Sequence, residues 1–194
     1  MKKKKENLSI YVALLRGINV GGNSLVRMSD LKALFEKAGF ERVRTYIASG
    51  NVIFSAKETE PRKLEVLVEK FLAAKYPFAP KVVVHSFDEM ERVIDGIPSG
   101  WEKGTERKYN VIFLKASVDS KKILEGLGPK KEIEEVHYFP GVLYWSVLTS
   151  DLARTSMVKL SANKIYQEVT VRNLNTTEKL FELMKEIGVN PEES

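Results

Sequence analysis

Residues 42–55, RVRTYIASGNVIFS, decide the fold because they predict two β-strands joined by a tight turn. Arg42–Ile47 alternates in the manner of a strand with one apolar face, and Asn51–Ser55 is again strand-like. Ser49 and Gly50 separate the two runs, and glycine supports the backbone of a tight connection. The stretch therefore predicts an antiparallel hairpin.

The segments on either side of the hairpin predict the order β-α-β-β-α-β. Leu8–Leu15 is a short apolar run, which is typical of a buried strand. Apolar residues then recur at helical spacing, with Ser29 as the expected N-cap and Gly39 just beyond the helix. After the hairpin, Pro61 is expected in the first turn of a second helix, and Val82–Val84 is expected to form the fourth strand.

The second half of the chain predicts the same order again. The expected elements are a strand at Tyr109–Lys115, a helix at Asp119–Leu127, strands at Glu132–Phe139 and Val142–Leu148, a helix at Asp151–Leu160 and a strand at Val169–Arg172. A final helix is expected to begin at Asn175 with Glu178 completing a capping box, and to end at Gly188. Ser86 and Glu89 predict a similar helix start between the halves.

A β-α-β-β-α-β unit is the ferredoxin-like α/β plait. The chain is therefore expected to be an α+β protein, with two such units in series and a C-terminal helix. A single larger mixed sheet with helices on one side is the alternative. We expect a disordered basic tail at 1–7, a first domain at 8–96, a linker at 97–107 and a second domain at 108–194.

Composition excludes several kinds of chemistry. The chain has 194 residues and no cysteine, so disulfides, thiolate metal sites and cysteine nucleophiles are excluded. His85 and His137 are the only histidines, which excludes a three-histidine metal site within one chain. No metal, no cofactor and no recognisable catalytic constellation are expected, so whether the protein is an enzyme stays open.

The charge of the chain lies mainly in its first residues. The net charge is +5, but Lys2–Lys5 supplies four of these charges, and the rest of the chain has 27 Lys and Arg against 26 Asp and Glu. The tail is expected to attract polyanions weakly. The sequence has no apolar run of membrane-spanning length, and we expect a cytoplasmic protein, with a monomer favoured over an oligomer.

Two loops are expected to meet at one end of the first sheet. In the plait, the first and second strands run the same way and the third runs back between them, so the end of the first strand lies beside the hairpin turn. Three glycines follow the first strand, and their free N–H groups could receive an anion beside an arginine. The expected ligand-binding residues are Arg16, Gly17, Asn19, Gly21, Gly22, Asn23, Ser49, Gly50, Asn51, Arg172 and Asn173.

Three stretches carry a resemblance: RGINVGGNSLVRMSDLKALFEKAGF from Arg16, TYIASGNVIF from Thr45 and TVRNLNT from Thr170. They resemble the hallmark stretches of a bacterial family catalogued as domain of unknown function 1697. The resemblance runs in order from Tyr11 to Ile187 and implies a duplicated α/β plait and no assigned activity. Asn23 stands where the family commonly has lysine.

Three functions follow from these observations. The first is a binding protein for a phosphate-bearing ligand, either a nucleotide or RNA, at the edge of the first plait. The second is a protein–protein interaction module, because a fold alone does not define a function. The third is a metal-independent enzyme acting on a small substrate.

Overall fold

The computed structural model describes residues 8–20, 24–57, 60–101, 104, 106–160 and 164–189. The predicted tail, with Lys2–Lys5, and the predicted site residues Gly21, Gly22 and Asn23 lie outside these ranges. The contacts within the chain divide it into two compact units. The first unit comprises Met1–Met90 with Leu180–Ser194, and the second comprises Glu91–Lys179. The predicted linker at 97–107 stays a prediction that limited proteolysis can test.

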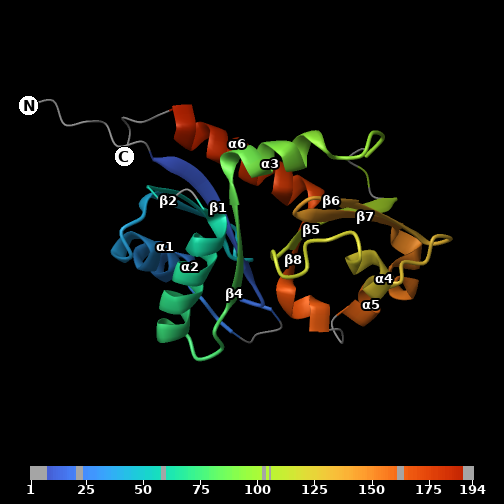
Figure 1. Cartoon of the computed structure of the whole chain (residues 1–194), viewed down its shortest axis with the longest axis horizontal. Helices are drawn as coiled ribbons and strands as arrows, with labels where there is room; N and C mark the ends of the chain where they lie inside the picture. Colours follow the sequence, from blue (N-terminus) through green and yellow to red (C-terminus); the bar gives the residue numbers. More distant parts are fainter. Residues whose placement is uncertain are drawn as a thin grey trace, which may run out of the picture. The chain divides into compact units, whose positions relative to one another are not determined.

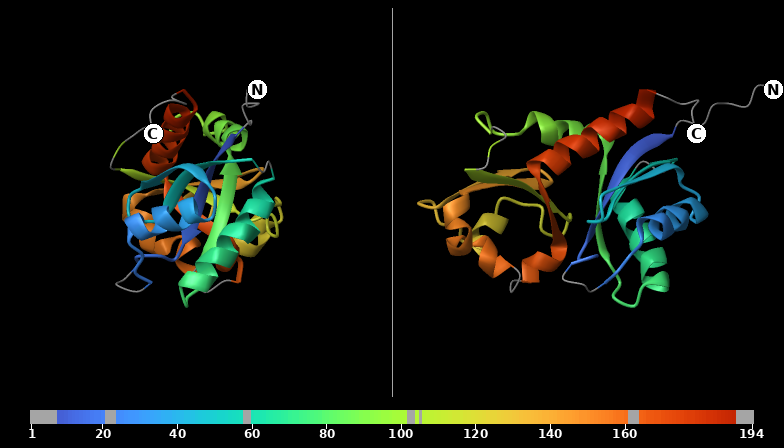
Figure 2. Two further views of the ribbon diagram at one scale, coloured as in Figure 1. Left: turned by 90° about the vertical axis from the view of Figure 1, so that its left-hand side faces the viewer. Right: turned by 180° about the vertical axis from the view of Figure 1, so that it is seen from behind.

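The first unit contains a four-stranded antiparallel sheet with helices α1 and α2 on one face (Figure 1 and Figure 2). The strands lie in the order β2-β3-β1-β4, so β3 lies between β1 and β2 as predicted. Aromatic and aliphatic side chains, among them Tyr11, Phe35, Phe54 and Leu72, form the core of this unit. The elements are β1 (Ser9–Arg16), α1 (Met28–Lys37), β2 (Glu41–Tyr46), β3 (Asn51–Ala56), α2 (Pro61–Lys75) and β4 (Lys81–Ser86), with the end of α6 (Leu174–Val189).

The second unit contains a second four-stranded antiparallel sheet, in the order β6-β7-β5-β8. Its core includes Ile112, Leu143 and Trp145. The elements are β5 (Arg107–Leu114), α4 (Ile123–Leu127), β6 (Glu134–Phe139), β7 (Val142–Leu148), the 3-10 helix η1 (Thr149–Arg154), α5 (Met157–Leu160), the 3-10 helix η2 (Lys164–Glu168) and β8 (Val169–Asn173). The protein is thus α+β with two antiparallel sheets, as the sequence predicts.

The helices of the second unit are shorter than predicted. The expected helix at Asp119–Leu127 begins only at Ile123, and the expected helix at Asp151–Leu160 is divided into η1 and α5. Buried Glu134 accepts hydrogen bonds from the backbone N–H groups of Lys130 and Ser156, at 3.0 and 2.8 Å. This carboxylate therefore holds two irregular segments in place where a longer helix was expected.

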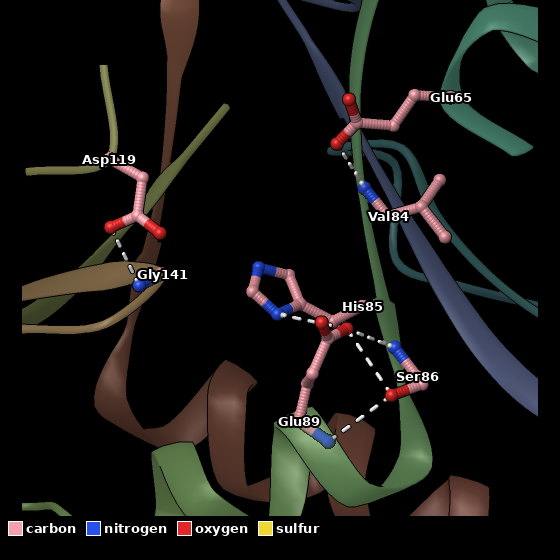
Figure 3. Close-up of polar contacts among 7 residues, drawn as sticks. All are labelled: Glu65, Val84, His85, Ser86, Glu89, Asp119 and Gly141. Carbon is pink, nitrogen blue, oxygen red and sulfur yellow. Dashed lines mark hydrogen bonds and ion pairs between the residues drawn. The ribbon is translucent and has the colours of Figure 1, made fainter. Parts of the chain in front are cut away.

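The helix starts show where local sequence patterns succeed and fail. The predicted capping box opens α3 (Phe87–Asp95): Ser86 N–H donates to the Glu89 carboxylate at 2.8 Å, and Glu89 N–H donates to the Ser86 hydroxyl at 3.3 Å (Figure 3). Two other predicted caps are wrong. The residue preceding α1 is Arg27 rather than Ser29, and it makes no side-chain cap. The cap of α6 is Asn173 rather than Asn175, since Asn173 Oδ1 accepts from Thr176 N–H at 2.7 Å.

The open edge of the first sheet is covered by two glutamates of α2. Edge strands expose unpaired N–H groups that can recruit another strand. On the edge strand β4, Val84 N–H donates to the Glu65 carboxylate (Figure 3), and Val82 N–H donates to that of Glu69, each at 3.0 Å. The two glutamates are four residues apart, about one helix turn, so both side chains lie on the same side of α2. They therefore reach the N–H groups of two alternate residues of β4 and occupy this edge within the unit.

Candidate functional site

The loop after β1 and the turn between β2 and β3 meet at one end of the first sheet. Leu15 N–H donates to the Gly50 carbonyl at 2.8 Å, and Leu14 lies opposite Asn51 in the β1–β3 register. The predicted convergence of the two loops is therefore confirmed. We call this region, residues 16–20, 24–26 and 47–51 together with Lys81 at the start of β4, the first loop end.

Asn19 fastens the two loops together. Its side-chain amide donates to the carbonyls of Val26 and Ala48, at 2.9 and 2.8 Å, and its Oδ1 accepts from Val26 N–H at 2.8 Å. The residue lies in the left-handed region, with φ of 54°, which asparagine tolerates better than most residues. The amide that was expected to bind a ligand thus holds the loop in shape.

Gly50 and Asn51 also build the turn. Gly50 has φ of 80°, and a Cβ there would lie 2.6 Å from Ile18 Cδ1 and 2.8 Å from Leu15 Cβ, so the position requires glycine. Asn51 is fully buried, and its amide donates to the Tyr46 carbonyl and the Ser49 hydroxyl, at 2.9 and 3.0 Å. Gly17 and Ser49 are exposed and Arg16 is partly exposed, so these residues line the accessible surface of the first loop end.

Two cations face each other across neighbouring strands at this end. The β1–β4 register places Arg16 directly opposite Lys81, and directly opposed residues project from the same face of a sheet. Opposed like charges are unfavourable. Lys81 Nζ lies 3.5 Å from a Glu69 carboxylate oxygen, an exposed pair that offsets part of the charge. The first loop end therefore brings two cationic side chains to one face of the sheet, one of them paired with Glu69.

The equivalent end of the second sheet has the same backbone contact, but there a cation faces an acid rather than a second cation. Leu114 N–H donates to the Gly141 carbonyl at 2.9 Å, as Leu15 N–H does to Gly50. Lys115 N–H donates to the Glu168 carbonyl at 2.9 Å, so an acid stands opposite the cation. Asp119 Oδ1 accepts from Gly141 N–H at 2.9 Å (Figure 3) and from the Tyr138 hydroxyl at 3.0 Å. We call this region, from Leu114 to Asp119 with Tyr138, Gly141 and Glu168, the second loop end.

Arg172 and Asn173 belong to the second unit, whereas the other predicted site residues that the structure describes belong to the first. Arg172 is 7% exposed, and its guanidinium donates to the Thr170 hydroxyl at 2.9 Å and to the Val171 carbonyl at 2.8 Å. Burial lowers the pKa of Arg172 to about 10, so the group stays charged at neutral pH. Asn173 is the cap of α6. Both side chains therefore have roles in the second unit.

Lys81 is the residue of the first loop end that sequence reasoning missed. It lies between Pro80 and the strand at Val82–Val84, which gave no sign of function. Only the pairing of β1 with β4 brings it opposite Arg16. Among the residues that the structure describes, no three acidic or imidazole side chains gather in a metal-binding arrangement, and no helix could cross a membrane.

Residues 8–144 match the family described as Protein of unknown function (DUF1697), and the chain belongs to that family. No match is found among curated proteins. The chain is similar to the solved structure of the conserved bacterial protein SP0830 from Streptococcus pneumoniae. The two share 25% identity with a TM-score of 0.81, and the likeness covers 92% of this chain and 99% of that one.

Proposed function

We propose that the protein binds a phosphate-bearing ligand at the first loop end, with Arg16 and Lys81 as its counter-charges. The observation that carries the proposal is the register that opposes these two cations across β1 and β4. A phosphate oxygen bound by both side chains would relieve their repulsion, and charge-assisted hydrogen bonds to phosphate are among the stronger polar contacts in proteins. The exposed Gly17 backbone and the Ser49 hydroxyl lie on the same loops and add donors.

The rigidity of the two loops supports this proposal. The side chains of Asn19 and Asn51 make hydrogen bonds that hold the loops in one arrangement. Gly50 allows the close packing of the turn because it has no side chain. A site that is shaped before the ligand arrives loses less conformational entropy on binding. The predicted roles of these residues are therefore reassigned, from contacting the ligand to positioning the residues that do.

A nucleotide fits the proposed site better than RNA. RNA-binding proteins of this size usually carry an excess of basic residues, whereas the chain beyond Lys2–Lys5 is almost neutral. The face of β3 also lacks the paired stacking aromatics of RNA-recognition domains. The proposal thus names a small phosphate ester, held at one end of the sheet.

We also infer that the two units are copies of one ferredoxin-like α/β plait. Both sheets have the strand order second-third-first-fourth, and the contact of Leu15 with Gly50 is repeated by Leu114 with Gly141. The shortened helices of the second unit are then the part of the plait that diverged.

Titration of the full-length protein with inorganic phosphate, followed by calorimetry at low and high salt, tests the function. Arg16→Ala and Lys81→Ala should each weaken binding by about 1.5–3 kcal/mol, and added salt should weaken binding of the unmodified protein. Lys115→Ala, at the corresponding place on the second sheet, is the matched control and should leave binding unchanged.

Two outcomes would contradict the proposal. Phosphate affinity that is unchanged in both Arg16→Ala and Lys81→Ala would show that these cations hold no anion. An Arg16→Ala variant that unfolds, together with a folded Lys81→Ala variant that binds normally, would make Arg16 a structural residue. Circular dichroism melting of each variant distinguishes loss of binding from loss of fold.

A further inference from the structure

The second unit has a cavity on one face of its sheet. The cavity has a volume of about 430 Å³, within the range of small-molecule sites, and it lies between the segment Pro98–Trp101 and residues of β5 and β6. It is separate from the first loop end, because every residue that lines it belongs to the second unit.

The floor of the cavity is a row of side chains across three strands. The register places Tyr109 of β5 opposite Ser146 of β7, and Ser146 opposite Glu135 of β6. Opposed residues share a face, and so do residues two apart on one strand, which brings Arg107 and His137 to the same face. The other face of this sheet carries the core, with Ile112, Leu143 and Trp145.

One wall of the cavity is aromatic. The ring of Trp101 lies on that of Tyr109, with centroids 4.8 Å apart and planes inclined by 35°. The edge of Trp101 meets Tyr144 at 5.9 Å, and Tyr144 is fixed because its hydroxyl donates to the Val93 carbonyl at 2.6 Å. Within the described part of the chain, the buried indole N–H of Trp101 has no acceptor. A buried donor without a partner is uncommon in a folded protein.

The polar groups of the cavity can form hydrogen bonds with the edge of a flat ring. Arg107 donates to the Glu135 carboxylate at 3.3 Å and to the Ser146 hydroxyl at 3.0 Å, which orients the guanidinium. The Glu135 side chain is 56% exposed and the His137 side chain is also exposed, so both keep capacity for further hydrogen bonds.

A smaller cavity of about 150 Å³ continues the larger one. Arg107 and Tyr109 line both cavities, so the two are adjacent. Lys108, Asn173 and Asn175 also line the smaller cavity, and Lys108 lies between Arg107 and Tyr109 on β5. The combined groove thus has an aromatic end and a cationic end, with Arg107 between them.

We propose that this groove binds a nucleoside monophosphate, with the base in the larger cavity beside Trp101 and the phosphate in the smaller one beside Lys108. The stacked aromatic rings suit the flat face of a base. The carboxylate of Glu135 and the imidazole of His137 suit its hydrogen-bonding edge. Arg107 and Lys108 exceed Glu135 by one charge, which suits one phosphate rather than a triphosphate.

The test compares AMP, GMP, CMP and UMP with their nucleosides, by calorimetry on the full-length protein. At least one monophosphate should bind, its nucleoside should bind more weakly, and Trp101→Ala should weaken both by roughly 5- to 150-fold, the usual loss for one stacking contact. Lys108→Ala should weaken binding of the monophosphate and leave binding of the nucleoside unchanged.

The controls separate this site from the first loop end. Arg16→Ala should leave nucleoside binding unchanged, and Trp101→Ala should leave binding of inorganic phosphate at the first loop end unchanged. Trp101→Phe keeps an aromatic ring and removes the N–H, so partial retention of affinity shows that stacking contributes. Trp101→Ala must keep the circular dichroism of the unmodified protein, and Tyr109→Ala provides a second test of the wall.

Three results would overturn the inference. The first is that none of the four monophosphates binds. The second is that a folded Trp101→Ala or Tyr109→Ala variant binds with the same affinity as the unmodified protein. The third is that Lys108→Ala weakens binding of the nucleoside and of the monophosphate equally. The second and third results do not bear on the proposed function, which is tested with inorganic phosphate and Arg16→Ala. The first result would in addition exclude these nucleotides as ligands of the first loop end. Loss of phosphate binding in Lys108→Ala, with normal binding in Arg16→Ala, would instead contradict the proposed function alone.

Discussion

The two loop ends share one backbone design and differ in the charge that they present. In each, a leucine N–H at the end of the first strand donates to a glycine carbonyl in the following hairpin, at 2.8 Å in the first unit and 2.9 Å in the second. At the first loop end Arg16 faces Lys81, whereas at the second Lys115 faces Glu168. The topology therefore gives the two ends the same backbone contact, and a few side chains give them different charges.

The side chain that links the loop to its hairpin also differs in charge between the two loop ends. Asn19 donates its amide to a carbonyl of the first hairpin, whereas Asp119 accepts an N–H of the second. An amide links the first loop to its hairpin and adds no charge beside Arg16 and Lys81. A carboxylate fastens the second loop and adds a negative charge. The linking side chain is thus neutral at the first loop end and a carboxylate at the second.

The largest expected effect comes from Gly50→Ala in the first hairpin. The positive φ costs about 1–2 kcal/mol for a residue with a Cβ, and the overlap with Ile18 and Leu15 adds about 1–3 kcal/mol. Gly17→Ala is the matched control. Gly17 has φ of 71° with no atom near the added Cβ, so only the smaller cost applies. Urea denaturation measures both, and equal losses would contradict the close packing at Gly50.

The next effect concerns the buried carboxylate that holds the second unit together. Burial alone would raise the pKa of Glu134, but hydrogen bonds from the N–H groups of Lys130 and Ser156 and from the Trp145 indole outweigh it and lower that pKa. Glu134→Gln places an amide donor among these donors and should cost about 2–3 kcal/mol at neutral pH. In the first unit, Glu65 accepts from Val84 N–H at 3.0 Å, and Glu65→Gln is the matched comparison, since a glutamine keeps an oxygen that can accept this bond.

The pH dependence of the free energy of unfolding tests the role of Glu134 independently. Because the pKa of Glu134 is lower in the folded state, its stabilisation is complete above the unfolded value of about 4.3 and is lost as the pH falls through the folded value. Glu134→Gln should therefore flatten the loss of stability between about pH 4.3 and more acidic values. An acid limb identical to that of the unmodified protein would show that Glu134 does not contribute to it.

The smallest expected effects come from exchanging the fastening residues. Asn19→Asp directs a carboxylate at the carbonyls of Val26 and Ala48 and should cost about 1–3 kcal/mol. Asp119→Asn keeps an oxygen for Gly141 N–H and should cost less than about 1 kcal/mol. Thermal melting of both variants measures the asymmetry. Similar losses would mean that the two loop ends are not fastened by opposite hydrogen-bond directions.

The sequence predicted the elements whose signals are local. The hairpin follows from alternation on both sides of Ser49 and Gly50, and the start of α3 follows from Ser86 and Glu89 three residues apart. The cap of α6 was placed two residues too late, because Asn173 and Asn175 are equally good caps in sequence. The helix at Asp151–Leu160 was predicted whole, because its pattern does not show that Glu134 holds this region in another conformation.

The sequence by itself therefore determined the class of fold, the order of the strands along the chain, the meeting of the two loops and the family. Only the tertiary structure decided that Lys81 faces Arg16, that Asn51 and Arg172 are buried, and that Trp101 lies on Tyr109. The physical reason is the distance along the chain between the residues that interact. Turns and caps are decided by neighbours a few residues apart, whereas register, burial and cavities depend on segments that meet only when the chain has folded.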